Sequence, residues 1–221
     1  MKKTKIFLAC DTTNLTRIKK IINQSKTNKI KVGYKFGLEF MNSKKGRQFI
    51  SRLKNKIIFV DLKLNDTVNT MVSAVKAMKD LKINYLTVHI SSGLSALKAV
   101  KKISGLTKVV GVTTLTSLDN RDLKLIGYNK SVKNLVTHQA KLAKKADLDA
   151  LVCSPYEVRA VRKIFKKEII TPGVQIGKRN FDQKRSMEAK KVESDWLVIG
   201  RAITASGNIK KNIQNLVKQL R

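Results

Sequence analysis

The stretch Phe59-Val60-Asp61-Leu62-Lys63-Leu64-Asn65-Asp66-Thr67 joins a buried apolar run to a cluster of charges. Residues 57–60 have the β-branched and aromatic composition of a buried strand. Asp61 and Lys63 are two residues apart, so both side chains point to one face of that strand. Because burying charge is costly unless it is compensated, two interpretations stay open. The charges form a structural ion pair, with Asp66 as the N-cap of the next helix, or they form a functional site.

Seven more apolar runs of strand length occur along the chain, and segments with helical periodicity separate them. The predicted strands are residues 6–10, 30–34, 57–64, 85–90, 109–115, 150–153, 169–174 and 196–199. Strict alternation of strands and helices requires parallel strands, and eight repeats in 221 residues predict an α/β fold, the (β/α)₈ TIM barrel. A doubly wound open sheet is the alternative. Against it, the first run continues into Asp11-Thr12-Thr13-Asn14, which lacks the glycine-rich dinucleotide-binding turn.

Length and composition favour a single domain over residues 1–221, because no Gly/Ser-rich or low-complexity linker interrupts the chain. Cys10 and Cys153 show neither Cys-x-x-Cys spacing nor a disulfide framework, which indicates a reducing compartment. No segment approaches the length of a membrane span. We therefore expect a cytoplasmic protein that does not associate with membranes.

A formal net charge of +32 suggests nucleic-acid binding through neutralised phosphates. The lysines, however, are spread over every predicted helix, with no basic tail and few aromatic residues to stack on bases. We expect no specific nucleic-acid site, although a basic nucleic-acid-binding protein remains an alternative of a different class. The excess charge can also attract a small anionic substrate.

Polar residues stand at the ends of the predicted strands, and in a barrel these ends share one mouth, where the fold places its active site. They are Asp11, Asp61, Lys63, Asp66, His89, Ser91, Thr116, Ser117 and Ser154, and Lys31 lies within the second run. His89 is equally well explained as a hydrogen-bonded wall residue, and we do not count it as catalytic. No group of His, Cys and carboxylates has zinc spacing, so no metal site is predicted.

Glycines follow the seventh and eighth runs, in Pro172-Gly173 and Gly200-Arg201. Loops at this place in a barrel often hold a phosphate through backbone N–H groups. Arg201 can add a bidentate, charge-assisted grip. The alternative for each glycine is a turn that requires a small residue.

The segment Asp61-Leu62-Lys63-Leu64-Asn65-Asp66 resembles the Asp-x-Lys-x-x-Asp motif of the orotidine 5′-phosphate decarboxylase family. Seven further segments resemble the family in the same order along almost the whole chain. They are 9–11, Lys31-Val32-Gly33, 88–89, 112–117, 152–154, 171–174 together with 182–185, and 198–201. The resemblance implies a barrel enzyme, active as a homodimer, that converts orotidine 5′-monophosphate (OMP) to UMP and CO₂ in de novo pyrimidine biosynthesis. It also implies that the enzyme uses neither a metal nor an organic cofactor.

The resemblance assigns roles by position. The charged catalytic network comprises Lys31, Asp61, Lys63 and Asp66. Asp66 and Thr67 reach into the site of the neighbouring subunit. Asp11 contacts the ribose and Thr116 the pyrimidine. The remaining substrate-binding positions, mainly at the phosphate, are Pro172, Gln183, Gly200 and Arg201.

Three positions depart from the usual pattern of the family. Gln175 replaces an Arg that meets the phosphate, so this contact is weaker or comes from Lys178 or Arg179. Phe181 replaces a loop Gly, which puts the conformation of the closing loop in doubt. Asp147 replaces a Gly before the sixth strand, without an expected effect on the chemistry.

The implied chemistry explains why a lysine is needed. Loss of CO₂ leaves an electron pair in the plane of the pyrimidine ring at C6, where the ring delocalises it poorly. Lys63 is expected to stabilise this charge and then protonate C6, with Asp61 and Asp66 favouring its ammonium form. The nearest rival is a Mg²⁺-dependent sugar-phosphate decarboxylase or aldolase of the same superfamily. Those enzymes have an acidic residue where this chain has Lys31, and a lysine is a poor neighbour for a divalent cation.

Overall fold

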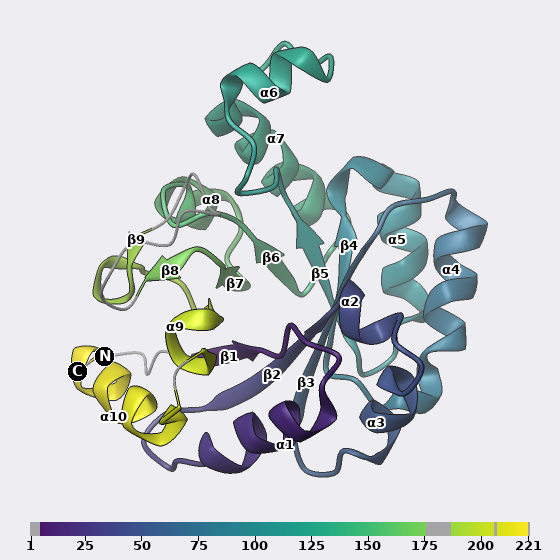
Figure 1. Ribbon diagram of the computed structural model, residues 1–221. Coiled ribbons are helices and arrows are strands. Elements are labelled where there is room, and N and C mark those ends of the chain that lie inside the picture. Colours follow the sequence, from purple (N-terminus) through teal and green to yellow (C-terminus); the bar gives the residue numbers. More distant parts are fainter. Residues whose placement is uncertain (1–4, 176–186, 206, 221) are drawn as a thin grey trace.

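Eight parallel strands close into a barrel in the computed structural model, which describes residues 5–175, 187–205 and 207–220 (Figure 1). Around the barrel the order is β1-β10-β7-β6-β5-β4-β3-β2, and β1 closes the sheet by pairing with β10. The strands are β1 (Lys5–Ala9), β2 (Val32–Gly37), β3 (Ile57–Leu64), β4 (Tyr85–His89), β5 (Lys108–Val112), β6 (Ala150–Val152), β7 (Glu168–Thr171) and β10 (Trp196–Ile199). This closed barrel confirms the predicted fold and excludes the open sheet.

A short parallel pair, β8 (Val174–Gln175) and β9 (Met187–Glu188), forms a second sheet after β7. Helices cover the outside of the barrel (Figure 1). They are α1 (Leu15–Gln24), α2 (Leu38–Met41), α3 (Gly46–Arg52), α4 (Val68–Ala77), α5 (Leu94–Ile103), α6 (Asn120–Leu125), α7 (Val132–Lys145), α8 (Val158–Ile164), α9 (Arg201–Thr204) and α10 (Ile209–Gln219). Short 3₁₀ turns are η1 (Lys79–Leu81), η2 (Ile90–Ser92) and η3 (Ala189–Lys191). Within these described residues, no helix combines the length and the apolar character that crossing a membrane requires.

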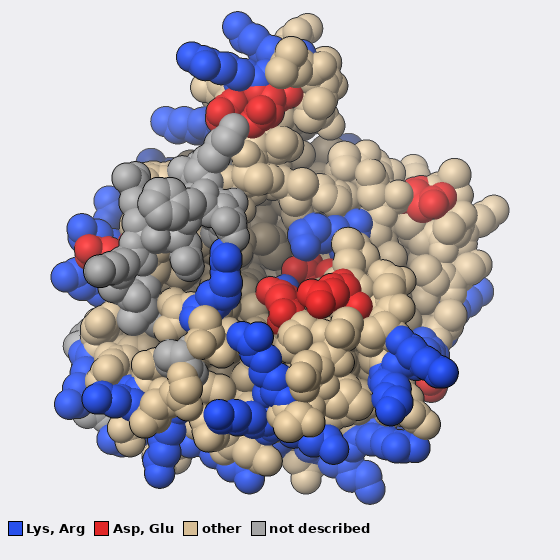
Figure 2. Space-filling model, viewed as in Figure 1, with Lys and Arg blue, Asp and Glu red and all other residues tan. Residues whose placement is uncertain are grey.

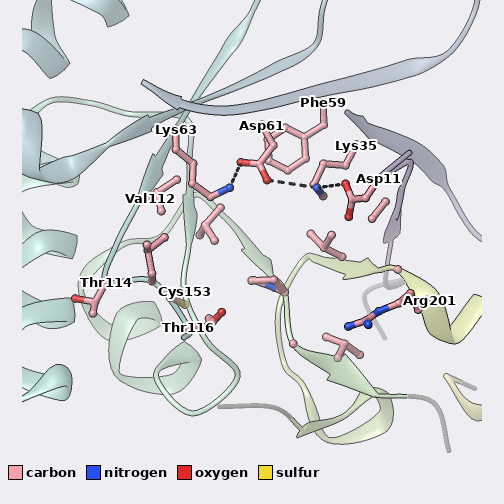
Figure 3. Close-up of a pocket in the computed structure, with 18 of the residues that line it drawn as sticks. Asp11, Lys35, Phe59, Asp61, Lys63, Val112, Thr114, Thr116, Cys153 and Arg201 are labelled. Atoms are coloured by element: carbon pink, nitrogen blue, oxygen red, sulfur yellow. Dashed lines mark hydrogen bonds and ion pairs between the residues drawn. The ribbon is translucent and has the colours of Figure 1, made fainter. Parts of the chain in front are cut away.

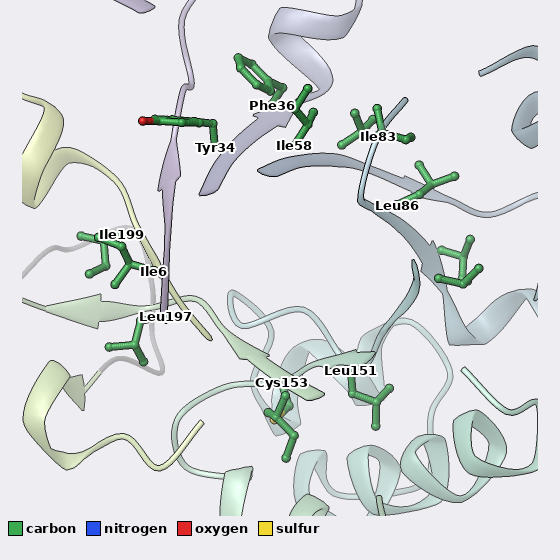
Figure 4. Packing of buried hydrophobic residues seen from close by; sticks show 14 of the residues in the cluster. Ile6, Tyr34, Phe36, Ile58, Ile83, Leu86, Leu151, Cys153, Leu197 and Ile199 are labelled. Atoms are coloured by element: carbon green, nitrogen blue, oxygen red, sulfur yellow. The ribbon is translucent and has the colours of Figure 1, made fainter. Parts of the chain in front are cut away.

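Alternating residues of the strands build two separate cores. In β1, Ile6 and Leu8 face the helices and join the larger core between barrel and helices (Figure 4). Phe7 points the other way, into the barrel, where its ring stacks on Trp196 with centroids 4.0 Å apart. Gly33 makes room for this ring, because a Cβ there would lie 2.6 Å from a ring carbon of Phe7. The barrel interior is therefore packed with side chains, as the fold requires.

A carboxylate closes the amino-terminal end of the barrel. Glu168 accepts hydrogen bonds from Lys5 at 2.6 Å, Lys108 at 2.8 Å and the Tyr85 hydroxyl at 2.9 Å. Burial alone would raise the pKa of Glu168, but these donors bring it to about 2. The amino-terminal end of the barrel is thus filled by an ionised carboxylate with three hydrogen-bond donors. A site can therefore open only at the other end, where the strands have their carboxyl ends.

Asp147, which the resemblance places where a glycine is expected, has a backbone conformation that favours glycine. Its φ is 57°, in the left-handed region, which glycine adopts freely and aspartate more readily than most residues. Lys167 holds it there, with Nζ donating to the Asp147 carbonyl at 3.0 Å and to Oδ1 at 2.6 Å. Asp147 therefore affects only the turn before β6, which lies away from the carboxyl ends of the strands.

Candidate active site

A cavity of about 540 Å³ opens at the carboxyl ends of the barrel strands. This is the size range of small-molecule sites, and it is the end at which barrels place their chemistry. Of the residues expected to have catalytic or substrate-binding roles, seven line this cavity: Asp11, Asp61, Lys63, Thr116, Pro172, Gly200 and Arg201. In Figure 3 the charged residues from β1 to β3 lie along one side of it, and Arg201 lies on the other.

Four side chains of alternating charge form a continuous row on the first side (Figure 3). Lys35 Nζ lies 3.0 Å from Asp11 Oδ1 and 3.5 Å from Asp61 Oδ2. The other oxygen of that carboxylate, Asp61 Oδ1, accepts from Lys63 Nζ at 3.0 Å. The row thus runs Asp11, Lys35, Asp61, Lys63, and each inner member touches two opposite charges.

The pairing keeps the inner members charged. Burial alone would raise the pKa of Asp61, but Lys35 and Lys63 outweigh burial and hold this pKa below its usual value. Burial alone would lower the pKa of Lys35, but Asp61 and Asp11 raise it above its usual value. Both groups are therefore ionised at neutral pH, although each side chain is only 12% exposed.

The backbone of β3 is irregular where it presents these charges. Val60 pairs with Leu86 and Leu64 with Val88, so β3 carries three residues where β4 carries one. Such a bulge turns side chains away from their regular direction and is common beside active sites. Within it Lys63 has a φ of 51°, in the left-handed region, which costs a residue with a side chain about 1 kcal/mol. The interactions of the site must offset this strain.

The expectation that Lys31 belongs to the charged network is wrong. Lys31 is exposed and precedes β2, and its carbonyl accepts from the Ile6 N–H at 2.9 Å, at the amino-terminal end of the barrel. Residues 31–37 contain Lys-x-Gly twice, at Lys31 and at Lys35, and both lysines have the same strand parity. Only the second stands near the carboxyl end, because β2 runs to Gly37 rather than ending at residue 34. Four residues of strand separate the two lysines by about 13 Å.

The wall between the two sides of the cavity is formed by Val112, Thr114, Thr116 and Cys153. The loop after β5 is fastened by Gln139 of α7, which is buried and whose Oε1 accepts from the Thr114 N–H at 2.8 Å and from the Thr114 hydroxyl at 3.2 Å. Thr116 follows this anchor and faces the cavity. The four side chains of this wall carry no charge.

The second side of the cavity follows β7 and β10. Gly173 has a φ of 73°, so the turn after β7 does require glycine, and the same residue lines the cavity. Gly200 precedes α9, whose first residue is Arg201, and both also line the cavity together with Gln175. Gln183, Lys178, Arg179 and Phe181, expected in the closing loop, lie outside the described residues.

Asp66 and Thr67 do not line the cavity of their own chain. Both are exposed, and Asp66 Oδ1 accepts from the Thr67 N–H at 2.6 Å. Thr67, not Asp66, is the N-cap residue of α4, so the interpretation of Asp66 as that cap is wrong. Among the described residues of its own chain, Lys63 meets one carboxylate, Asp61. The other carboxylate expected near it, Asp66, was assigned to the site of the neighbouring subunit.

Other candidates from the sequence stay outside the site. His89 is half-buried, does not line the cavity, and has a pKa lowered by burial and by the charge of Lys63. Across the part of the chain that the structure describes, no three His, Cys, Asp or Glu side chains are grouped as metal ligands. The residue that sequence reasoning missed is Lys35, and its signal was the second Lys-x-Gly.

Comparisons with known proteins agree with one another over nearly the whole chain. The model of a family described as "Orotidine 5'-phosphate decarboxylase / HUMPS family" matches residues 4–216. A protein of Wolbachia pipientis subsp. Culex pipiens named orotidine 5′-phosphate decarboxylase is 39% identical, over 97% of this chain and 98% of its own. One of that name from Buchnera aphidicola subsp. Acyrthosiphon pisum is 36% identical, over 98% and 95%. The crystal structure of orotidine 5′-phosphate decarboxylase from Lactobacillus acidophilus superposes with a TM-score of 0.84 at 27% identity, covering 99% of this chain and 100% of that one.

Proposed function

This chain belongs to the orotidine 5′-phosphate decarboxylase / HUMPS family, and from that membership we propose how its own residues carry out the reaction. The activity is that of a carboxy-lyase of pyrimidine biosynthesis, which converts OMP to UMP and CO₂. The observation that carries the mechanism is the row of alternating charge that ends at Lys63 in the cavity.

Lys63 is the group that we place at the reacting carbon. The bond between C6 and the carboxylate breaks, CO₂ leaves, and the electron pair stays on C6. The ammonium group of Lys63 stabilises this pair electrostatically and then donates a proton to C6, which yields UMP. Asp61 supports this role because its Oδ1 accepts from Lys63 Nζ at 3.0 Å and holds the ammonium in place.

Lys35 acts on the reaction through Asp61 and Asp11 rather than at the reacting carbon. Its contacts with Asp61 and Asp11 balance two carboxylates that would otherwise repel the anionic substrate. In this arrangement Asp11 binds the ribose and Thr116 the pyrimidine. The proposal thus replaces Lys31 by Lys35 in the catalytic set and keeps Asp61 and Lys63.

The phosphate is proposed to lie on the opposite side, at Pro172, Gly200 and Arg201, with Gln183 of the undescribed loop as a further contact. A guanidinium suits a phosphate because it donates two parallel hydrogen bonds. Binding energy from the distant phosphate can be used to orient the ring and exclude water at C6.

The direct test follows the pyrimidine absorbance of OMP with purified protein in the presence of EDTA. We expect full conversion to UMP at a rate that the chelator leaves unchanged, because Lys63 and Lys35 occupy the places beside Asp61 that a divalent cation would need. Activity lost with EDTA and restored by Mg²⁺ would favour a metal-dependent mechanism instead.

The homodimer is part of the proposal. Asp66 and Thr67 are exposed, Val68 beside them is an apolar residue 39% exposed, and none of them lines its own cavity. We propose that Asp66 and Thr67 complete the site of a second copy, where Asp66 adds a second carboxylate near Lys63. The functional unit would then be two single-domain barrels in the cytoplasm.

Mixed dimers test this arrangement. Lys63→Ala and Asp66→Ala should each be inactive alone, because each removes one half of a shared site. After the two are unfolded together and refolded, about one quarter of wild-type activity should return, since half of the dimers are mixed and each has one intact site.

The matched control mixes Lys63→Ala with Lys35→Ala. Both changes affect residues that serve the cavity of their own chain, so no mixed dimer has an intact site and no activity should return. Equal recovery in both mixtures, or none in the first, would exclude a shared site.

A further inference from the structure

Thr87 of β4 is fully buried and lies opposite the bulge of β3. It stands between Leu86 and Val88, the two residues that pair with the ends of the bulge. A regular parallel strand would offer backbone carbonyls to the N–H groups of its neighbour. Here the Lys63 N–H instead donates to the side chain of Thr87, with 2.7 Å between N and Oγ1.

The Thr87 hydroxyl joins the two charged residues in a closed ring of hydrogen bonds. It accepts from the Lys63 N–H, and it lies 3.0 Å from Asp61 Oδ1. Since an ionised carboxylate can only accept, the hydroxyl proton must point to Asp61. The same Oδ1 accepts from Lys63 Nζ at 3.0 Å, so the ring runs from the Lys63 backbone through Thr87 and Asp61 to the Lys63 side chain.

We propose that Thr87 is a positioning residue for decarboxylation, whose hydroxyl holds Lys63 in its left-handed conformation and fixes the orientation of the Asp61 carboxylate. A lysine at a φ of 51° returns to an ordinary conformation unless something holds its N–H. The hydroxyl of Thr87 accepts from this N–H. By donating to Asp61, the same hydroxyl also orients the carboxylate that accepts from the Lys63 ammonium group. This inference rests on the proposed role of Lys63.

Thr87→Val tests the inference, because it keeps the shape of the side chain and removes both hydrogen bonds. We expect kcat to fall roughly 10- to 100-fold, as for other losses of groups that orient catalytic residues, while the Kd for UMP changes less than about threefold. Thr87→Ser, which restores the hydroxyl, should return kcat to within about threefold of the wild type.

The pH profile supplies a second readout. The hydrogen bond from Thr87 helps to lower the pKa of Asp61, so losing it raises that pKa. The acid limb of the kcat profile should therefore move to higher pH in Thr87→Val and return in Thr87→Ser.

Thr113→Val is the matched control. Thr113 is 1% exposed, does not line the cavity, and its hydroxyl donates to the Val152 carbonyl at 2.8 Å. This variant loses a buried hydroxyl as well and should keep the wild-type kcat and pH profile. A Thr87→Val enzyme with wild-type kcat and profile overturns the inference, and so does an equal fall of kcat in both variants.

Two safeguards keep the test decisive. If Thr87→Val does not fold, Thr87→Ala removes the same hydroxyl without adding a methyl group against Asp61, and the same outcomes apply to it. A wild-type enzyme that does not convert OMP overturns the proposed function, whereas a wild type that turns over with an unaffected Thr87 variant overturns this inference alone.

Discussion

Lys63→Ala is expected to lower the rate of UMP formation by about 10⁴-fold or more, because it removes both the charge at C6 and the proton that C6 receives. The fold should persist, since the Lys63 side chain is 33% exposed and its removal leaves Asp61 with Lys35 and Thr87. The measurement is single-turnover conversion of OMP, with circular dichroism and the thermal midpoint as the check on folding.

The control for this change is Lys98→Ala, which removes an exposed lysine from α5 on the outside of the barrel. It carries the same loss of charge and should keep full activity. A folded Lys63→Ala enzyme that turns over at more than about one hundredth of the wild-type rate would exclude Lys63 as the proton donor.

Lys35→Ala is expected to lower kcat roughly 100-fold, whereas Lys31→Ala should change it less than about twofold. Removing Lys35 takes one of two cations from the buried Asp61, which keeps Lys63, and breaking a buried ion pair costs up to about 3 kcal/mol of stability. Lys31 is exposed at the other end of β2, where it meets none of these groups. Steady-state kinetics and urea denaturation of both variants measure the two effects.

This pair of variants distinguishes Lys31, which the family resemblance assigned to the network, from Lys35, which pairs with Asp61 in the structure. The reverse result, with Lys31→Ala inactive and Lys35→Ala unaffected, would show that the charged row in the cavity is not the catalytic network. Because both variants lose one positive charge and the two positions are only four residues apart, differences in overall net charge do not account for the contrast.

The net charge of +32 is spread over the surface and does not require a binding site for a partner. In Figure 2, Lys and Arg side chains are scattered over most of the visible face, while acidic side chains gather in few places, one of them near the centre. The row of Asp11 and Asp61 with their two lysines belongs to the cavity rather than to this outer surface. A positive surface around a cavity attracts an anionic nucleotide without a specific nucleic-acid site.

The fold followed from the sequence because alternation of apolar strands and amphipathic helices is a local property. The predicted range of β3, residues 57–64, agrees with the structure at both ends. The predictions for β5 and β7 ran past Val112 and Thr171. The residues that follow do not continue these strands, and most of them line the cavity: Thr114, Leu115, Pro172, Gly173 and Val174.

The sequence by itself determined the barrel, the open end at which chemistry occurs, and the identity of Asp61, Lys63 and Arg201 as cavity residues, because strand parity and strand ends are readable from residue order. Only the tertiary structure decided which of two lysines, Lys31 or Lys35, meets Asp61, since both share a strand face and differ only in height along the barrel. Only the structure also revealed the role of Thr87. The bulge opposite it arises from the pairing of β3 with β4, and neither strand's sequence alone predicts it.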